Sequence, residues 1–420
     1  MTGIARGLFG LAVILALAWC LSEDRRRIPL RTVLGGVLLQ IALALLLLRF
    51  PPATRVFFVL DDAVNALQRA TDAGTSFVFG YLGGGPAPFA VTDAPSRFIL
   101  AFRALPLVLV IGALASLLFY WGILQRVVQG FAWLLRRSMG IGGALGLGAA
   151  VHIFVGMIEA PLLVRPYLAR MSRGELFALM SCGMAGIAGT MMVIYATILG
   201  PVIPNALGFI LIASVISTPA ALAVAAVMIP FDAAVREPAQ LVTDEPASGA
   251  MDAIVRGTAA GLSLLVNIIA MLVVLVALTA LVNSGLALLP AWHGAPITLQ
   301  RVLGGLFAPL MWLIGLPWPQ ALVAGELMGT KTILNELVAY LNLAQLPPGT
   351  LTPRSRLMLI ASLCGFANLG SVGIIIGGVG AMVPERRAEI AVLGMRSLIS
   401  GTAATCMSGA VVGMLIGPNG

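Results

Sequence analysis

The chain alternates between long apolar runs and short polar stretches. A continuous apolar run of about 20 residues is typical of a transmembrane helix. Such runs predict spanning helices at residues 3–21, 33–49, 98–122, 204–229, 252–286, 355–383 and 389–416. Two further apolar regions, residues 140–200 and 302–345, are interrupted by Gly, Pro and single charges, which favours broken or re-entrant helices.

Two more polar regions separate these runs. Residues 51–97 have an amphipathic pattern that predicts an interfacial helix followed by an external loop. Its charged residues include Asp61, Asp62, Arg69 and Asp72. Residues 230–250 form a polar connector, which we expect to be the hinge between two halves of the chain.

The composition excludes a soluble globular protein. Hydrophobic residues make up 60% of the 420-residue chain and charged residues only 10%, with a mean hydropathy of +1.03. Ordinary soluble domains contain about 25% charged residues. No core would be large enough to hide this much apolar surface.

The net charge of +8 is scattered along the chain, and Lys331 is the only lysine. Scattered arginines argue against nucleic-acid binding, because in a membrane protein a positive excess mostly sets topology. The polar stretch at residues 22–31 therefore lies in the cytoplasm, which places the N-terminus outside. Its arginines are Arg25, Arg26, Arg27 and Arg31.

Few residues offer enzymatic or metal chemistry. The cysteines lie in apolar runs without a CxxC pair, so we expect structural thiols and no metal cluster. They are Cys20, Cys182, Cys364 and Cys406. The two histidines, His152 and His293, are far apart, and no HExxH or GxSxG motif occurs. We expect neither an enzyme nor a cofactor, and a solvent-exposed His293.

Two segments of the chain match each other. Residues 182–190 align with residues 364–372, with Cys, Gly and Ala at the same positions. Both segments collect Gly and small polar residues where a spanning helix should be continuous, and glycine permits local unwinding. Paired broken helices in two related halves indicate the midplane site of a secondary transporter. Close helix packing by small residues is the alternative.

A carboxylate in an apolar setting precedes each broken segment. Glu159 precedes the first and Glu336 precedes the second, at nearly the same offset. An intramembrane carboxylate costs about 2.5–3.5 kcal/mol on insertion scales and is by default a functional candidate. The alternative is a structural salt bridge with Arg165 or Lys331.

Three long motifs resemble the concentrative nucleoside transporter family in their order and spacing. They are FVGMIEAPLLVRPYLARMSRGELFALM (154–180), GTKTILNELVAY (329–340) and LCGFANLGSVGIIIGG (363–378). The resemblance implies an all-α polytopic membrane protein with about eight transmembrane helices and two re-entrant helical hairpins. It also implies an inverted repeat with broken helices, and a homotrimer in which a transport domain moves like an elevator against a scaffold domain.

On this basis we divide the chain into four parts. Residues 1–135 are N-terminal scaffold helices with the interfacial helix, and residues 136–229 are the first repeat of the transport domain. Residues 230–318 are a connector and a long scaffold helix. Residues 319–420 are the second repeat.

This chain keeps some of the family's substrate-binding residues and changes others. Its nucleobase motif Gly-Gln-Thr-Glu becomes Gly156, Met157, Ile158 and Glu159, which keeps the carboxylate but loses an amide and a hydroxyl. The ribose side is intact and consists of Asn335, Glu336, Phe366, Asn368 and Ser371. The resemblance therefore implies a conserved ribose half and a more apolar base half.

This chain also differs from the family pattern at the sodium site. Sodium-coupled members have Asn and Ser where this chain has His152 and Gly186. Val155 and Ile187, whose backbone carbonyls complete that site, are kept. Losing two side-chain oxygens leaves too few ligands for sodium, whereas histidine can exchange a proton near neutral pH. We expect proton coupling, with His152, Glu159 and Glu336 as candidate carriers, although His152 could simply pack between helices.

The leading hypothesis is a proton-coupled importer of nucleosides or close analogues in the bacterial inner membrane. The partners expected are a small nucleoside, membrane lipid and two further copies of the chain, and not nucleic acid. A sibling symporter for nucleobases or modified nucleosides, and sodium-coupled nucleoside transport, stay open. A sensor without transport is disfavoured, because it has little reason to keep costly polar groups in the membrane.

Overall fold

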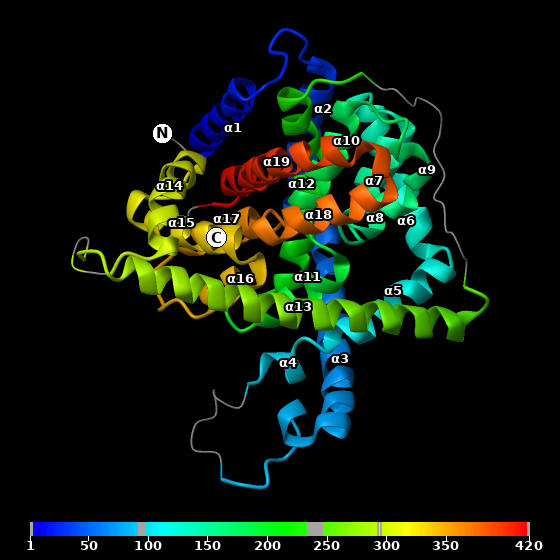
Figure 1. The fold of residues 1–420 in the computed structure, drawn as a ribbon, viewed down its shortest axis with the longest axis vertical. Helices are drawn as coiled ribbons and strands as arrows, with labels where there is room; N and C mark the ends of the chain where they lie inside the picture. Colours follow the sequence, from blue (N-terminus) through cyan, green and yellow to red (C-terminus); the bar gives the residue numbers. More distant parts are fainter. Residues whose placement is uncertain (1–2, 91–97, 233–246, 292–293, 295, 418–420) are drawn as a thin grey trace.

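The computed structural model describes residues 3–90, 98–232, 247–291, 294 and 296–417, and its regular elements in these ranges are all helices. Figure 1 shows their arrangement. His293, residues 91–97 of the expected external loop and residues 233–246 of the connector lie outside the described residues.

The N-terminal part consists of long helices. It contains α1 (Gly3–Cys20), α2 (Leu30–Arg49), α3 (Pro51–Phe79) and the short η1 (Gly80–Gly83). Proline at the first positions of α3 fits a helix start, since the missing N–H groups would be unpaired there in any case. α3 is the helix predicted in residues 51–97, and it projects away from the body below α13 (Figure 1).

Two similar helix groups follow. The first begins with α4 (Leu100–Arg103), α5 (Leu107–Tyr120) and α6 (Ile123–Met139). The second begins with α13 (Ala250–Leu286) and α14 (Leu299–Ile314). The pattern of apolar runs did not predict α6 and α14 as separate helices. The division placed between residues 135 and 136 falls inside α6, which ends before Gly140 in a left-handed conformation.

Each group then continues with a hairpin, a broken helix and a long helix. The first group has α7 (Gly143–Val151), α8 (Glu159–Leu163), α9 (Arg165–Leu168), α10 (Arg173–Ala185), α11 (Gly189–Leu199) and α12 (Ala206–Met228). The second has α15 (Trp318–Ile333), α16 (Glu336–Ala344), α17 (Pro353–Leu363), α18 (Leu369–Met382), η3 (Pro384–Arg386) and α19 (Arg387–Leu415). The predicted breaks therefore lie at residues 186–188 and 364–368.

The two broken helices begin in the same way. Ser172 accepts a hydrogen bond from the backbone of Glu175, whose carboxylate bonds back to the backbone of Ser172, a complete capping box. Thr352 accepts a hydrogen bond from the backbone of Ser355 at the start of α17. Matching caps are what a sequence repeat should produce.

The two breaks meet inside the protein. The backbone N–H of Phe366 donates to the carbonyl of Gly186 over 3.2 Å. A Cβ atom at Gly365 would lie 2.9 Å from the carbonyl oxygens of both Met184 and Ala185. Such close backbone approach is possible only because residue 365 has no side chain.

The fold matches the predicted polytopic membrane protein. Seven helices or helix pairs among the described residues are long and apolar enough to cross a membrane. The α17–α18 pair, which is interrupted by its break, is not among these seven, and α18 is one of the shorter apolar helices. The single helix expected at residues 252–286 is α13, and the two hairpins are formed by α7–α9 and α15–α16.

The packing separates a central body from a helix pair. α10, α12, α17 and α19 pack on one another, and α1 and α2 pack against α12 and α19. A buried chain of hydrogen bonds joins three of these helices, from Gln40 to Ser408 (3.1 Å) and from Ser408 to Ser217 (2.8 Å). α5 and α13 pair closely through Gly112 and Gly257, as small residues permit in membrane helices.

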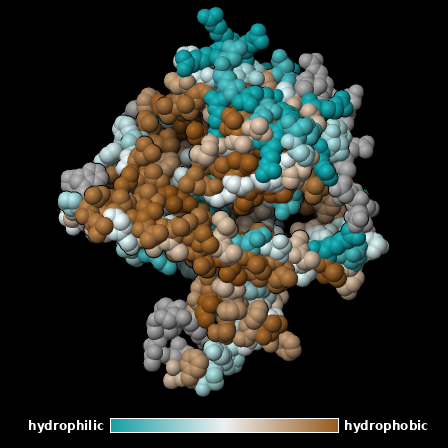
Figure 2. All heavy atoms as spheres, viewed as in Figure 1, coloured by the Kyte–Doolittle hydropathy of each residue, from teal (hydrophilic) through white to brown (hydrophobic). Residues whose placement is uncertain are grey.

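The surface reflects a membrane environment. Figure 2 shows apolar residues over α13 and the left of the view, and hydrophilic residues at the top, where the α1–α2 loop lies. α13 exposes a row of apolar side chains: Met251, Val255, Leu262, Val266, Val273 and Leu281. Exposed apolar surface of this extent is suited to lipid or to another protein.

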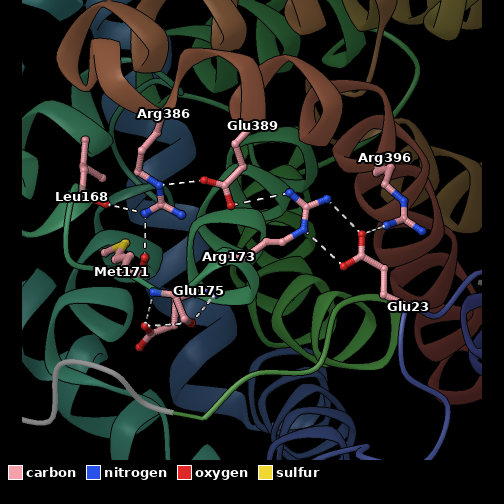
Figure 3. Close-up of polar contacts among 9 residues, drawn as sticks. Glu23, Leu168, Met171, Arg173, Glu175, Arg386, Glu389 and Arg396 are labelled. Carbon is pink, nitrogen blue, oxygen red and sulfur yellow. Dashed lines mark hydrogen bonds and ion pairs between the residues drawn. The ribbon is translucent and has the colours of Figure 1, made fainter.

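An ionic cluster ties the α1–α2 loop, α10, η3 and α19 together (Figure 3). Glu23, in the α1–α2 loop, pairs with Arg173 at 3.0 Å and also with Arg396 of α19. Glu389 bonds Arg386 at 2.8 Å and pairs with Arg173 at 3.5 Å. The hydrogen bond and charge of Arg173, with help from Arg396, hold the pKa of Glu23 below its ordinary value.

Candidate functional site

The tip of the second hairpin presents a carboxylate at a helix N-terminus. The side chain of Asn335 caps α16 by accepting a hydrogen bond from the backbone of Val338 over 3.0 Å. This cap begins α16 at Glu336. A helix N-terminus favours negative charge, so the local fold supports a carboxylate at this position.

Glu336 is buried and hydrogen-bonded on both oxygens. The Tyr195 hydroxyl donates to Oε1 over 2.5 Å, and the Asn368 amide donates to Oε2 over 3.1 Å. Only 3% of Glu336 is exposed. The carboxylate is therefore fixed by groups from α11 and from the second break, while it belongs to α16.

The second broken helix supplies the rest of this cluster. Asn368 is the N-cap of α18, and its Oδ1 accepts from the backbone of Ser371 over 2.8 Å. Its amide thus joins Glu336 to the start of α18. Phe366 is half-buried, and its backbone reaches Gly186 in the first break. The structure therefore brings together the predicted Asn335, Glu336, Asn368 and Ser371.

The buried Lys331 lies on the same hairpin but does not pair with Glu336. Its Nζ donates to the carbonyl of Ser362 over 3.0 Å and to the Thr405 hydroxyl over 3.4 Å. Among the described residues, no ion pair joins Lys331 to Glu336. The alternative of a Lys331–Glu336 salt bridge is therefore wrong, and Lys331 instead ties α15 to α17 and α19.

His152 lies in the turn after α7 and is 2% exposed. A Cβ atom at Gly183 would be 3.0 Å from its Cε1, so the imidazole lies against α10 three residues before the break. Its Nε2 has no hydrogen-bond partner among the described residues. A buried polar atom without a partner is costly, and in a native structure it calls for an explanation such as an exchanging proton or ion.

The other predicted ion-site residues surround this turn. The carbonyl of Phe154, next to Val155, accepts from the backbone of Gly189 at the start of α11 over 3.0 Å. Gly186 and Ile187 are buried in the first break. A Cβ atom at Gly186 would lie 3.2 Å from the His152 carbonyl oxygen, so hairpin and break are in direct contact.

Glu159 does not join the buried cluster. It begins α8 and is exposed, and no hydrogen bond or ion pair links it to Glu336 in the described part of the chain. A Cβ atom at Gly156 would lie 2.3 Å from its Oε2, so the carboxylate folds back over the hairpin turn. The structure therefore buries Glu336 and leaves Glu159 exposed at the hairpin turn.

The two apolar residues between Gly156 and Glu159 pack against helices. Met157 is 6% exposed and lies beside Gly183 of α10. A Cβ atom at Gly378 would lie 2.0 Å from Cδ1 of Ile158, so Ile158 fills a notch in α18. Both residues replace polar groups of the family motif with packing contacts.

A cavity of about 290 Å³ lies elsewhere, between α3, α11 and the following turn. Polar residues on its lining include Asn65, Gln68, Thr197 and Asn205, and none of the predicted site residues belongs to it. No group of three or more His, Cys, Asp or Glu side chains suited to a metal occurs within the described ranges.

Comparisons with known proteins decide the family. Models of the Na+ dependent nucleoside transporter N-terminus and C-terminus match residues 9–82 and 209–413, and a nucleoside recognition model named Gate matches residues 101–202. The chain is 34% identical to the nucleoside permease NupC of Helicobacter pylori, over 98% of this chain and 97% of that protein. The chain belongs to the concentrative nucleoside transporter family.

Other members of the family are similarly close. An uncharacterised transporter of Haemophilus influenzae is 37% identical over 99% of this chain and 98% of its own. The structure of CNTnw in an inward-facing substrate-bound state superposes with a TM-score of 0.87 at 33% identity, covering 99% of this chain and 98% of that one. This concentrative nucleoside transporter is therefore a multi-pass protein of the bacterial inner membrane with scaffold and transport domains, and it is not an enzyme.

Sequence reasoning missed Tyr195. It lies in the apolar helix α11 and belongs to none of the motifs that carried the family resemblance. A single buried tyrosine in a membrane helix is a weak signal, because its hydroxyl can bond any nearby carbonyl. The only hint was its place seven residues after the first break.

Proposed function

We propose that this transporter imports nucleosides or close analogues across the inner membrane by proton symport. The substrate part of the proposal rests on the Glu336 cluster and on family membership. The coupling part rests on His152, whose buried Nε2 has no hydrogen-bond partner in the described part of the chain, at the position where sodium-coupled members have an asparagine.

The Glu336 cluster suits a hydroxyl-rich ligand. A carboxylate held by two donors still has one lone-pair site free on each oxygen, and hydrogen bonds from hydroxyls to a carboxylate are charge-assisted. Asn335 and Asn368 place the N-termini of α16 and α18 at this point. A ribose diol fits this chemistry better than an apolar solute.

The residues at the expected ion site suit sodium poorly. Sodium needs several oxygen ligands, and residues 152 and 186 offer an imidazole and no side chain. An imidazole can take up and release a proton at physiological pH. Its turn contacts the first break directly, so protonation there can bias how hairpin 1 sits on α10 and α11.

Two alternatives have specific support. Sodium coupling is named in the family descriptions, and the backbone carbonyls of Val155 and Ile187 are retained. A nucleobase or modified nucleoside is favoured by the apolar pair Met157 and Ile158, which makes no directional hydrogen bond to a base.

We also propose a homotrimer that works by an elevator motion. The apolar outer face of α13 provides surface for a second copy or for lipid. The close α5–α13 pair, set beside the central body, provides a framework against which that body can move.

Uptake by purified protein in proteoliposomes tests the proposal. Labelled uridine and adenosine are supplied with an inward proton gradient, an inward sodium gradient or neither. We expect uptake that follows the proton gradient and does not respond to the sodium gradient. Sodium-dependent uptake without a pH response would overturn proton coupling, and no uptake of any ribosyl compound would overturn the substrate class.

A further inference from the structure

Tyr195 and Tyr340 are two buried tyrosines with different partners. Their rings pack at 5.0 Å between centroids, and both are 0% exposed. Tyr340 donates to the backbone carbonyl of Ile360 over 3.0 Å, an ordinary way to satisfy a buried hydroxyl. Tyr195 instead donates to a side-chain oxygen of Glu336 over 2.5 Å.

The bond from Tyr195 limits the orientation of Glu336. A carboxylate with one partner can turn about its last side-chain bond, whereas donors on both oxygens fix its plane. Asn368 holds Oε2 from the start of α18, and Tyr195 holds Oε1 from α11. The free lone-pair sites of the carboxylate therefore face one direction before any ligand binds.

Tyr195 also connects the two repeats. It lies in the second turn of α11, whose first residue, Gly189, bonds the Phe154 carbonyl of hairpin 1. Glu336 belongs to hairpin 2. One short rigid helix thus places a donor from the first repeat on the carboxylate of the second.

We propose that Tyr195 is a positioning residue that orients Glu336 for recognition of a substrate's vicinal hydroxyls. This inference rests on the proposed function, in which Glu336 binds the ribosyl group. Preorganisation of a polar group lowers the cost of binding without adding a contact. Removing the Tyr195 hydroxyl should therefore weaken substrates that use these hydroxyls and spare those that lack them.

The test compares Tyr195→Phe with the matched control Tyr340→Phe. Each change removes one buried hydroxyl and keeps the ring. Uptake in proteoliposomes gives the KM for uridine, and competition gives the Ki for 2′,3′-dideoxyuridine. For Tyr195→Phe we expect a uridine KM raised about tenfold, in line with a lost hydrogen bond to a charged group, and an unchanged Ki. Tyr340→Phe should leave the ratio of the two constants at the wild-type value.

A second variant covers the case in which Tyr195→Phe does not fold because Glu336 loses a partner. Tyr195→Phe combined with Glu336→Gln removes the charge as well. If Tyr195 acts through Glu336, the double variant has the same KM-to-Ki ratio as Glu336→Gln alone. A ratio unchanged by Tyr195→Phe, or further loss in the double variant, would overturn the inference. Absence of nucleoside uptake by the wild type would instead overturn the proposed function.

Discussion

Two buried polar side chains, Glu336 and His152, differ in how far the protein satisfies them. Glu336 has a donor on each oxygen, from Tyr195 and Asn368. His152 has no partner at Nε2 among the described residues. A fully satisfied group is ready to bind with fixed geometry, whereas an unsatisfied one still lacks a partner, so the two residues suit different tasks.

Replacing Glu336 by Gln tests whether this carboxylate binds the substrate. The change keeps the size but removes the charge that strengthens hydrogen bonds from ligand hydroxyls. Such bonds correspond to about 1.5–3 kcal/mol, so we expect binding of ribosyl substrates to fall roughly 10- to 100-fold. Isothermal titration with uridine measures this directly.

The matched control is Glu326→Gln, an exposed carboxylate on α15 of the same hairpin. It should bind uridine like the wild type. Wild-type affinity in Glu336→Gln would remove Glu336 from the substrate site.

Met157 and Ile158 are expected to set base selectivity. Substitution by Gln and Thr restores the polar groups of the family motif at these two positions. We expect sharper discrimination between uridine and adenosine, by about tenfold for one directional hydrogen bond gained. Competition uptake measures the ratio of their inhibition constants. An unchanged ratio would mean that the base binds elsewhere.

The sequence predicted the residues of the Glu336 cluster but not their environment. Asn335, Glu336 and Asn368 stand out because polar residues in apolar runs are costly. Tyr195 could not be found in this way, since only the packing of α11 on α16 reveals its partner. The exposure of Glu159 depends on how the turn at Gly156 folds, which its apolar neighbours do not reveal.

At the level of elements, the two helix breaks define the centre of the protein. Glycine content predicted both breaks, and the two lie in contact through the Phe366–Gly186 hydrogen bond. Their contact leaves no room for side chains at the crossing. The amphipathic helices α6 and α14 were missed because α6 directly follows the apolar run at residues 98–122 and α14 lies at the start of the interrupted region at residues 302–345.

Gly365→Ala should destabilise this crossing. The new Cβ would lie 2.8 Å from the Thr405 side chain and 2.9 Å from two backbone carbonyls, so the backbones must separate. Overpacking of this kind costs about 1–3 kcal/mol. We expect a lower melting temperature in detergent. Gly373→Ala on α18 is the control, because nothing lies within 4 Å of its Cβ position, and equal melting temperatures for the two variants would contradict the crossing.

The Glu23 cluster gives a prediction about pH. Because the folded pKa of Glu23 is lowered, its pairing stabilises the fold above the ordinary value of 4.5 and is lost as pH falls through the folded pKa. Glu23→Gln should lower the melting temperature at pH 7 and reduce the further loss below pH 4.5. Melting curves between pH 7 and pH 3 measure both effects.

Asp24→Asn is the control for this experiment. Among the residues that the structure describes, Asp24 bonds within its own loop alone, to the backbone of Arg26 and to the side chain of Arg27. It should melt like the wild type. Identical curves for Glu23→Gln and wild type would mean that the cluster does not hold the α1–α2 loop to α10 and α19.

For the whole molecule, the repeat explains most of the architecture. Two groups of helices, each with a hairpin, a broken helix and a long helix, were predictable from the matching segments 182–190 and 364–372. Which helices pack together was not predictable, because apolar runs in a membrane carry no pattern that selects a neighbour. The close α5–α13 contact depends on where Gly112 and Gly257 meet.

The central claim is that nucleoside movement carries protons, and a substrate-driven pH change tests it most directly. Proteoliposomes loaded with a pH-sensitive dye receive uridine in sodium-free buffer. We predict acidification of the lumen with the wild type and none with His152→Asn, while Tyr340→Phe acidifies like the wild type. Uridine uptake without acidification would contradict the account, and so would uptake that occurs only when sodium is added.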